Sequence, residues 1–422
     1  MGWTLRLGEG APPDRALIGG KAWSIARMAA LGLPVPPAFV VTTRACAEFQ
    51  RSGAFPEGLE GEIAEGIAWL EERTGRRYGA GPRALLVSVR SGAPVSMPGM
   101  MDTVLNMGIT GATEGALAAE TGDARFARDT HRRFWDLWAG IVQRLDGLLF
   151  APEEGPEGWG ARLAAAGGAM PEDAGERLRA AVRAVFESWN GRRARRYRQH
   201  HGIPDDLGTA VTVQAMVFGN LSPRSGTGVM FSRNPVTGER APYGEYLACA
   251  QGEDVVSGRF TPRPLEAMRE TVPEAHDALL AAAEALERDG REVQDIEFTV
   301  EDGRLWLLQS RAAKRAPQAA VRFAVDMVRE GVIAPEEALD RVSAEQVRTL
   351  LAPRLAEGAA GEEVARGEAA CPGVGQGVVV TDSDEAERRA AAGEAVVLAR
   401  ATTSPEDLHG MIAAKAVVTE QG

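Results

Sequence analysis

The sequence has 422 residues, 45% of them hydrophobic and 25% charged, which is ordinary for a globular protein of roughly two to four domains. Its net charge of −12 argues against a general nucleic-acid binder, because neutralising phosphates requires an excess of lysine and arginine. Three widely spaced cysteines (Cys46, Cys249 and Cys371) and the lack of a long apolar run argue against a disulfide framework, a cysteine-bound zinc and a membrane helix, so we expect a cytoplasmic protein.

Strand and helix signals alternate through the first hundred residues. The predicted elements are, in order, a strand near the N-terminus, a helix at 22–31, a strand at 38–43, a helix at 57–79 and a strand at 85–90. The first helix follows a glycine turn at residues 18–21 and ends at the proline-rich residues 32–37. Thr43 is placed to cap the helix that follows it. The last strand opens into a loop of glycine, proline and methionine that reaches Asp102.

Helical and strand regions then alternate on a larger scale. Residues 112–200 are predicted to be mostly helical, because apolar residues recur there every three or four positions. The charged, alanine-rich residues 316–366 suit a helical connector, and a glycine turn after Cys371 begins a small new domain. The other predicted elements are strands at 210–218, 228–231, 295–300, 305–308, 378–380, 395–398 and 417–418, and a helix at 274–288.

The first candidate binding motif is Gly19-Gly20-Lys21. A glycine turn before a helix lets the backbone approach a phosphate, and a lysine beside it supplies a positive charge. The same three residues are also consistent with an ordinary turn, and they lack the spacing of a Walker A motif. The motif alone leaves both interpretations open.

The second motif is the loop that follows Arg90, with the sequence Ser-Gly-Ala-Pro-Val-Ser-Met-Pro-Gly-Met-Met-Asp-Thr. A predicted strand delivers Arg90, and the loop offers glycines such as Gly99, hydroxyls such as Thr103 and backbone amides. Such a loop can fold over a polyphosphate while the planar guanidinium fixes the oxygens. The alternative is a structural loop with methionines packed beneath it.

The third motif is a predicted hairpin that carries two carboxylates. Side chains alternate along a strand, so Asp295 and Glu297 share one face, as do Gln309 and Arg311 on the next strand, with a turn at Gly303. Two neighbouring carboxylates repel each other unless a cation lies between them, and Mg²⁺ prefers a few carboxylates together with phosphate oxygens. A solvated strand face is the alternative, and the nearby Gln309 and Arg311 favour the metal site.

Three further patterns do not predict a site. Glycines along residues 218–258 are adequately explained by a plain hairpin. The basic run at residues 192–198 is interpreted as a solvated helix face, because it is short and the protein is acidic. The histidines share no ligand spacing on one helix face and are expected at the surface; they are His131, His200, His201, His276 and His409.

These motifs in this order, together with Leu31–Pro37 and Thr402–Asp407, resemble pyruvate, phosphate dikinase over essentially the whole chain. Phosphoenolpyruvate synthases and rifampicin phosphotransferases follow their arginine with Ser-Ala-Thr-Ala-Glu-Asp, whereas residues 92–99 have the dikinase form. The resemblance implies an α+β protein. Its parts would be an ATP-grasp nucleotide-binding domain at 1–312 with a helical insertion at about 112–200, a helical connector at 313–365, and a truncated swivelling phosphohistidine domain at 366–422.

The resemblance also implies ATP as substrate and Mg²⁺ as cofactor. The positions that it assigns to ATP are Lys21, Arg90, Gly99, Thr103, Gln309 and Arg311, and those that it assigns to the metal are Asp295 and Glu297. One departure lies beside the glycine turn, where the family's Gly-Gly-Lys-Gly-Ala-Asn-Leu is Gly-Gly-Lys-Ala-Trp-Ser-Ile, which places the bulk of Trp23 near the phosphates.

In the family, a histidine attacks the β-phosphorus of ATP and AMP leaves; phosphate then takes the γ-group, and pyruvate accepts the remaining phosphoryl group at a distant barrel. The sequence stops at Gly422, just before the Thr-Ser-His-Ala stretch that the resemblance leads us to expect. We therefore expect no complete turnover from this chain alone, and a second polypeptide that carries the histidine and the barrel if the chain functions in its cell. A non-catalytic ATP-binding module and the product of an interrupted gene are the alternatives.

Overall fold

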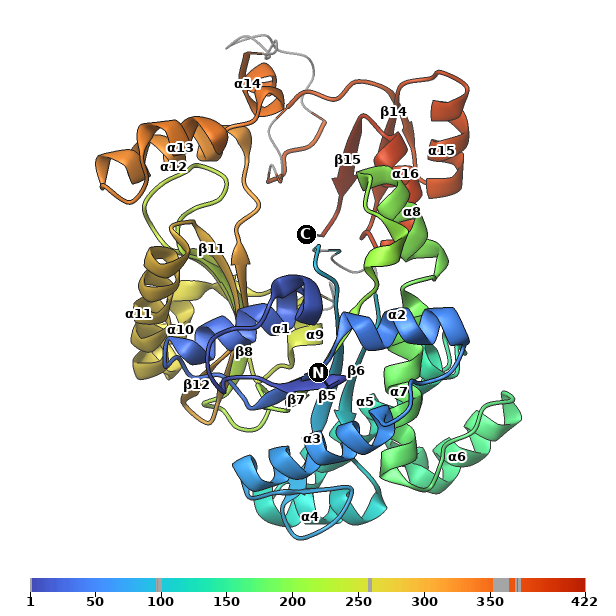
Figure 1. Ribbon diagram of the computed structural model, residues 1–422. Helices are drawn as coiled ribbons and strands as arrows, with labels where there is room; N and C mark the ends of the chain where they lie inside the picture. The colour runs from blue at the N-terminus through green and yellow to red at the C-terminus, as the bar shows by residue number, and fades with distance from the viewer. Residues whose placement is uncertain are drawn as a thin grey trace. The chain divides into compact units, whose positions relative to one another are not determined.

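The computed structural model describes residues 2–95, 97, 101–256, 260–351, 364–368, 370 and 373–421 (Figure 1). The chain divides into two compact units. Unit 1 contains Met1–Gly226 and Phe298–Ser310, and unit 2 contains Thr227–Glu297 and Arg311–Gly422. Helices and sheets occur in both units, which confirms the α+β class. The ATP-grasp and swivelling assignments and the predicted domain boundaries stay predictions.

Unit 1 contains a five-stranded sheet in which every neighbouring pair is antiparallel. In spatial order its strands are β1 (Thr4–Arg6), β2 (Ala38–Val41), β7 (Ala210–Ala215), β5 (Val87–Gly92) and β6 (Thr103–Met107). All residues of β2 and β7 are buried, and valine dominates these strands because β-branched side chains pack well on a pleated surface. A second, two-stranded sheet pairs β3 (Arg77–Tyr78) with β4 (Ala84–Leu85).

Helices account for most of the rest of unit 1. They are α1 (Arg15–Ala30), α2 (Thr43–Ser52), α3 (Leu59–Thr74), α4 (Gly111–Thr121), α5 (Ala124–Leu137), α6 (Gly155–Ala165), α7 (Ala174–Ser188), α8 (Arg192–His201), a π-helical turn at Trp138–Val142, and 3₁₀ turns at Pro152–Glu154 and Asp205–Leu207. The prediction that 112–200 is mostly helical is confirmed. Its apolar spacing buries Phe134, Trp138, Trp159 and Phe186 in the core of the unit.

Two local predictions near the N-terminus are wrong. Helix α1 begins at Arg15, not at residue 22, because Asp14 caps it by accepting a hydrogen bond from the backbone N–H of Ala16 at 2.9 Å. Thr43 does not cap α2, because Thr42 occupies the capping position. The Thr43 hydroxyl instead donates to the carbonyl oxygen of Ala16 at 2.9 Å, so this side chain joins α2 to α1.

The second five-stranded sheet has the order β10 (Arg263–Pro264), β9 (Tyr243–Ala248), β8 (Gly226–Phe231), β11 (Gln294–Glu301) and β12 (Arg304–Ala312). The predicted turn between β11 and β12 is confirmed. Asp302 and Gly303 have φ angles of 46° and 84°, and a two-residue turn with both φ values positive matches the twist of the strands it joins. Strands β8, β11 and β12 each contribute residues to both units.

The helices of unit 2 begin with α9 (Gly252–Val256), a 3₁₀ turn at Leu265–Ala267, α10 (Met268–Thr271), α11 (Pro273–Gly290), α12 (Pro317–Arg329), α13 (Pro335–Asp340) and α14 (Ala344–Leu351). Arg233, which follows β8 and is 2% exposed, joins two of them through their carboxylates. It donates to Glu287 of α11 at 2.7 Å and to Glu330, at the end of α12, at 2.6 Å. Burial lowers the pKa of Arg233, but the hydrogen bonds with the two glutamates outweigh it and raise this pKa above its usual range.

The last part of unit 2 is a three-stranded parallel sheet in the order β13 (Val378–Val380), β14 (Val396–Arg400) and β15 (Ala416–Thr419), which confirms the predicted strands. Parallel strands need crossover connections, which α15 (Ser383–Ala391), a 3₁₀ turn at Pro405–Asp407 and α16 (Leu408–Ala413) provide here. Val380, Ala386, Val396 and Leu398 form its core. Within the described ranges of the chain, no helix has both the length and the apolar character that crossing a bilayer requires.

Candidate functional site

The glycine turn lies inside α1, where Gly19 breaks the helical conformation. Its φ of 76° and ψ of 164° fall in a region that essentially only glycine adopts. A Cβ atom at Gly19 would lie 1.8 Å from the carbonyl oxygen of Gly92, the last residue of β5. The backbone N–H of Gly20 donates to Ala93 at 2.9 Å. The turn and the start of the loop after β5 are therefore held together backbone to backbone.

Lys21, Arg90 and Thr103 are brought to the same end of this sheet. Lys21 directly follows the glycine turn, and its Cβ lies 3.4 Å from the position that a Cβ of Gly92 would occupy. Arg90 and Gly92 share one face of β5, because side chains alternate along a strand. Arg90 pairs with Thr103 on β6 and with Thr212 on β7. Gly99 lies outside the described residues.

Thr212 is a polar residue of this group that the sequence interpretation missed. Its hydroxyl is buried and makes no hydrogen bond to the part of the chain that the structure describes. A buried hydroxyl without a partner costs free energy, so this position suits contact with a polar ligand. The signal in the sequence is weak, because Thr212 lies in the strand-like run Ala-Val-Thr-Val-Gln-Ala and threonine is common in strands.

Gln309 lies in unit 1, on β12, and residues next to it on this strand contact α1 and the segment just after that helix. The hydroxyl oxygen of Ser24, three residues after Lys21, accepts a hydrogen bond from the backbone N–H of Ser310 at 2.6 Å. The backbone N–H of Leu307 donates to Pro34 just beyond α1 at 2.8 Å. These contacts position the strand that carries Gln309 against the helix that carries Lys21.

Asp295, Glu297 and Arg311 form the second group, in unit 2. Asp295 is 4% exposed, and one of its carboxylate oxygens accepts from Arg311 Nε at 2.7 Å. Burial raises the pKa of Asp295, the charge of Arg311 opposes that rise, and the nearby charge of Glu297 adds to it. This interaction indicates that the two carboxylates lie near each other on β11, and their role at a metal stays a prediction.

The other oxygen of Asp295, Oδ1, is buried and has no hydrogen-bond partner among the residues described. A buried carboxylate oxygen without a partner costs free energy, and a cation or a hydrogen-bond donor can offset that cost. Oxygen donors from one or two carboxylates, completed by phosphate oxygens, are what Mg²⁺ prefers. The residues present therefore fit the cation that the sequence predicts.

The basic run at residues 192–198 is only partly a solvated face, which corrects the prediction. Arg198 is fully buried, and two contacts compensate its charge there. Its guanidinium stacks 4.1 Å from the Trp189 ring centroid and pairs with Asp205 at 2.6 Å. Arg193 lies 3.6 Å from Asp102, beside Thr103. Burial raises the pKa of Asp102, and Arg193 opposes that rise.

Two of the five histidines are buried, so the prediction of a surface position is wrong for them. The side chain of His131 is 2% exposed, and both of its ring nitrogens are hydrogen-bonded. The Nδ1–H donates to Glu114 at 2.6 Å, and Nε2 accepts from Trp135 at 3.1 Å. His276 is 4% exposed and lies 3.2 Å from Asp277. Burial lowers the pKa of His131, and because both of its ring nitrogens have protein partners we interpret this imidazole as structural.

Comparison with known proteins shows which family model and which proteins this chain resembles. The AMP/ATP-binding domain of pyruvate phosphate dikinase matches residues 51–274, slightly more than half of the chain. The chain is 44% identical over 440 residues to pyruvate, phosphate dikinase 1, chloroplastic, of Zea mays, covering 98% of this chain and 46% of that protein. It is 44% identical over 462 residues to the enzyme of Rhizobium meliloti and 42% over 447 to that of Clostridium symbiosum, with 51% of each covered. The chain thus spans about half the length of these curated relatives.

Proposed function

We infer that this chain, which belongs to the pyruvate, phosphate dikinase family, binds ATP with Mg²⁺ as the nucleotide-binding part of a dikinase-type phosphotransferase. The observation that carries the metal assignment is the buried, unsatisfied oxygen of Asp295 beside Glu297. A buried carboxylate oxygen without a hydrogen-bond partner, next to a second carboxylate, suits a divalent cation. The bound cation would neutralise the charge of the ATP phosphates.

The other residues take roles that follow from their chemistry. Lys21 and Arg90 place positive charge at the end of the unit 1 sheet, where they would bind phosphate oxygens. The hydroxyls of Thr103 and Thr212 lie beside Arg90 and would donate to the same oxygens. In unit 2, Arg311 holds Asp295 in place through a hydrogen bond, and its charge opposes the rise of the Asp295 pKa that burial causes. Gln309 and Gly99 are proposed ATP contacts on the family resemblance.

The single experiment that tests the metal assignment is Asp295→Asn. Asparagine keeps an oxygen for the hydrogen bond from Arg311 but removes the charge that the cation needs. We expect Mg-ATP affinity to fall about tenfold or more, which corresponds to a lost charged interaction of about 1.5–3 kcal/mol, and metal-free ATP affinity to change little. Isothermal calorimetry with each form of ATP measures both.

Two further variants complete this experiment. Asp277→Asn removes a carboxylate whose side chain is 72% exposed in the same unit, and it should leave both affinities unchanged. Arg90→Lys should weaken both forms of ATP alike, since it replaces a planar guanidinium with a point charge at the phosphates. Equal losses of Mg-ATP and metal-free ATP in Asp295→Asn would contradict the metal assignment.

We also propose that the phosphoryl-accepting histidine and the pyruvate-binding barrel belong to the part of such dikinases that this chain does not span. A polypeptide carrying that part should complement the chain. Mixing the two with ATP, phosphate and pyruvate should yield AMP and phosphoenolpyruvate, and Asp295→Asn should suppress the yield. Two folded pieces that bind ATP but form neither product would exclude complementation while leaving nucleotide binding intact.

A further inference from the structure

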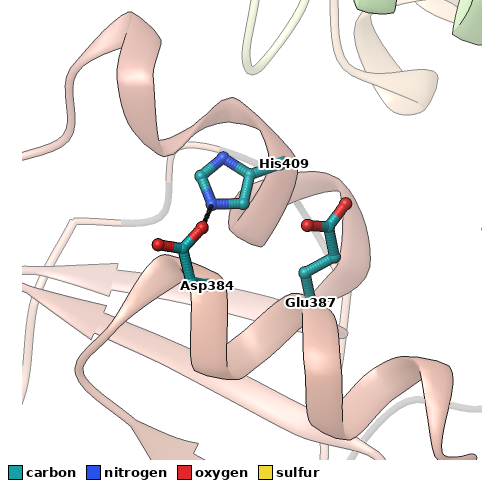
Figure 2. Close-up of side chains that lie close together, drawn as sticks. All are labelled: Asp384, Glu387 and His409. Carbon is teal, nitrogen blue, oxygen red and sulfur yellow. Dashed lines mark ion pairs between the residues drawn. The ribbon is translucent and has the colours of Figure 1, made fainter.

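Three side chains of the types that bind metal ions lie close together at the start of α15 (Figure 2). None of them belongs to the proposed nucleotide site. Asp384 and Glu387 are three residues apart on α15 and therefore lie on the same face of that helix. His409 comes from α16. One potential ligand atom from each of the three lies within 4.8 Å of the others.

The two helices are fastened to each other on both sides of His409. A Cβ atom at Gly410 would lie 2.6 Å from the Cα of Ser383, so only glycine lets α16 approach α15 this closely. The Ser383 hydroxyl donates to Asp407 at 2.7 Å, and both of these side chains are buried. The imidazole is thus held in place over Asp384 by the packing of its neighbours.

His409 is incompletely satisfied in this position. Its side chain is 12% exposed, and its Nε2 atom is shielded from solvent without a well-aligned hydrogen bond to any described residue. The nearest acceptor, Asp384 Oδ1, lies 2.9 Å from Nε2, a contact drawn in Figure 2. A shielded imidazole nitrogen without an aligned partner is a position that a ligand can stabilise.

The two carboxylates are available to the same ligand. Asp384 has a 91% exposed side chain, and Glu387 is also exposed, so both can change rotamer at little cost. The two arginines of this helix form ion pairs with Glu385 instead of with Asp384 or Glu387. Arg388 lies 3.4 Å and Arg389 lies 3.7 Å from the Glu385 carboxylate. Among the described residues, no arginine or lysine forms an ion pair with Asp384 or Glu387.

One of the distances between the three side chains suits a divalent transition ion. Metal–nitrogen and metal–oxygen bonds to such ions are about 2.1 Å long, so two ligand atoms are about 3.0 Å apart at a right angle and about 3.4 Å apart at the tetrahedral angle. The 2.9 Å separation of His409 Nε2 and Asp384 Oδ1 is close to the right-angle value, and the three ligand atoms all lie within 4.8 Å of one another. An imidazole ligand suits Zn²⁺, Ni²⁺ and other transition ions, whereas Mg²⁺ prefers oxygen ligands alone.

We propose that Asp384, Glu387 and His409 bind one divalent transition ion of the Zn²⁺ class, which ties α16 to α15 beside the three-stranded parallel sheet. Three protein ligands leave the remaining coordination positions to water. The site is independent of the proposed nucleotide site, because it shares no residue with it. It stabilises the folded form of residues 373–421, because an ion that binds only the folded state shifts the folding equilibrium.

The test is titration of the nucleotide-free chain with Zn²⁺, Co²⁺ and Mg²⁺ by calorimetry, with the visible spectrum of bound Co²⁺ as a second signal. One Zn²⁺ or Co²⁺ per chain should bind more tightly than Mg²⁺. His409→Gln and Asp384→Asn should each lower the affinity at least tenfold and remove the Co²⁺ absorption. The matched controls Glu385→Gln, on the same helix, and His200→Gln, an exposed histidine of α8, should leave both signals unchanged.

Three outcomes would overturn the proposal: no Zn²⁺ binding in the wild type, equal affinity in His409→Gln, or loss of affinity in Glu385→Gln. If His409→Gln fails to fold, imidazole NMR of the wild-type chain decides, since Zn²⁺ should shift the His409 Nε2 signal. A shift confined to His200 and His201 would reject the site. Asp295→Asn should retain the Zn²⁺ affinity, so failure of the nucleotide assignment and failure of this one remain distinguishable.

Discussion

Replacing Arg233 with methionine is expected to lower the free energy of unfolding by about 3–5 kcal/mol. The guanidinium is 2% exposed and makes hydrogen bonds to both Glu287 and Glu330. Methionine fills similar volume but leaves two carboxylates, 17% and 20% exposed, facing each other without a cation. Their repulsion and incomplete hydration would separate α11 from α12. Chemical denaturation followed by tryptophan fluorescence measures the loss.

Arg240 provides a matched control, because it forms an exposed ion pair with Glu330, the same carboxylate that the buried Arg233 contacts. Arg240 lies 3.6 Å from Glu330, but its side chain is 71% exposed. Arg240→Met should therefore cost less than about 1 kcal/mol, because solvent screens such pairs. Replacing Glu287 and Glu330 with leucine in the Arg233→Met background should recover much of the stability, since no charge is then left uncompensated. Equal losses in the two single variants would contradict this account.

The second large effect is expected at Gly19. Replacing it with alanine should destabilise the protein by roughly 2–5 kcal/mol, combining backbone strain at a positive φ with steric overlap. The new Cβ would lie 1.8 Å from the carbonyl oxygen of Gly92, and backbone on that side has little freedom to move. Because the displaced turn carries Lys21, we expect ATP affinity to fall with stability. Thermal unfolding and calorimetry at a temperature where the variant is folded measure the two effects.

Gly32→Ala is the control for this prediction. Gly32 also has a positive φ, 72°, but nothing lies within 4 Å of the position of its Cβ. It should therefore show the strain alone, about 1–2 kcal/mol, with ATP affinity unchanged. If Gly19→Ala costs no more than Gly32→Ala, the close approach of the glycine turn to β5 has no energetic importance.

Local sequence patterns predicted the fold well where their cause is local. The alternation in β11 and the Asp302-Gly303 turn determine a hairpin whatever surrounds them, and both are present. The start of α1 was missed because Asp14 lies among glycines and prolines that indicate a loop. Thr43 was misassigned because its hydroxyl bonds α1, which is distant in sequence, instead of its own helix.

In the candidate site too, features with a local cause were predictable and features that depend on distant residues were not. Alternation along one strand is enough to place Asp295 beside Glu297, so that pair was predictable. The unsatisfied Oδ1 of Asp295 and the buried hydroxyl of Thr212 depend on how strands pack, which no single-strand pattern contains. His409 was not predictable as a ligand, because its carboxylate neighbours come from α15 and no pattern within a single helix places them beside it.

The division of unit 1 into two chain segments has a consequence for its synthesis on the ribosome. Its second segment, Phe298–Ser310, supplies the buried Phe298, Leu305 and Leu307 and the backbone N–H that Ser24 binds. Unit 1 cannot complete its contacts until Ser310 has emerged, although its first segment ends at Gly226. At about 5–20 residues per second, translating residues 227–310, from the end of the first segment through Ser310, takes roughly 4–17 s. During that interval the nascent first segment exposes the surface that β12 later covers, and a fragment that ends at Gly226 would keep it exposed permanently.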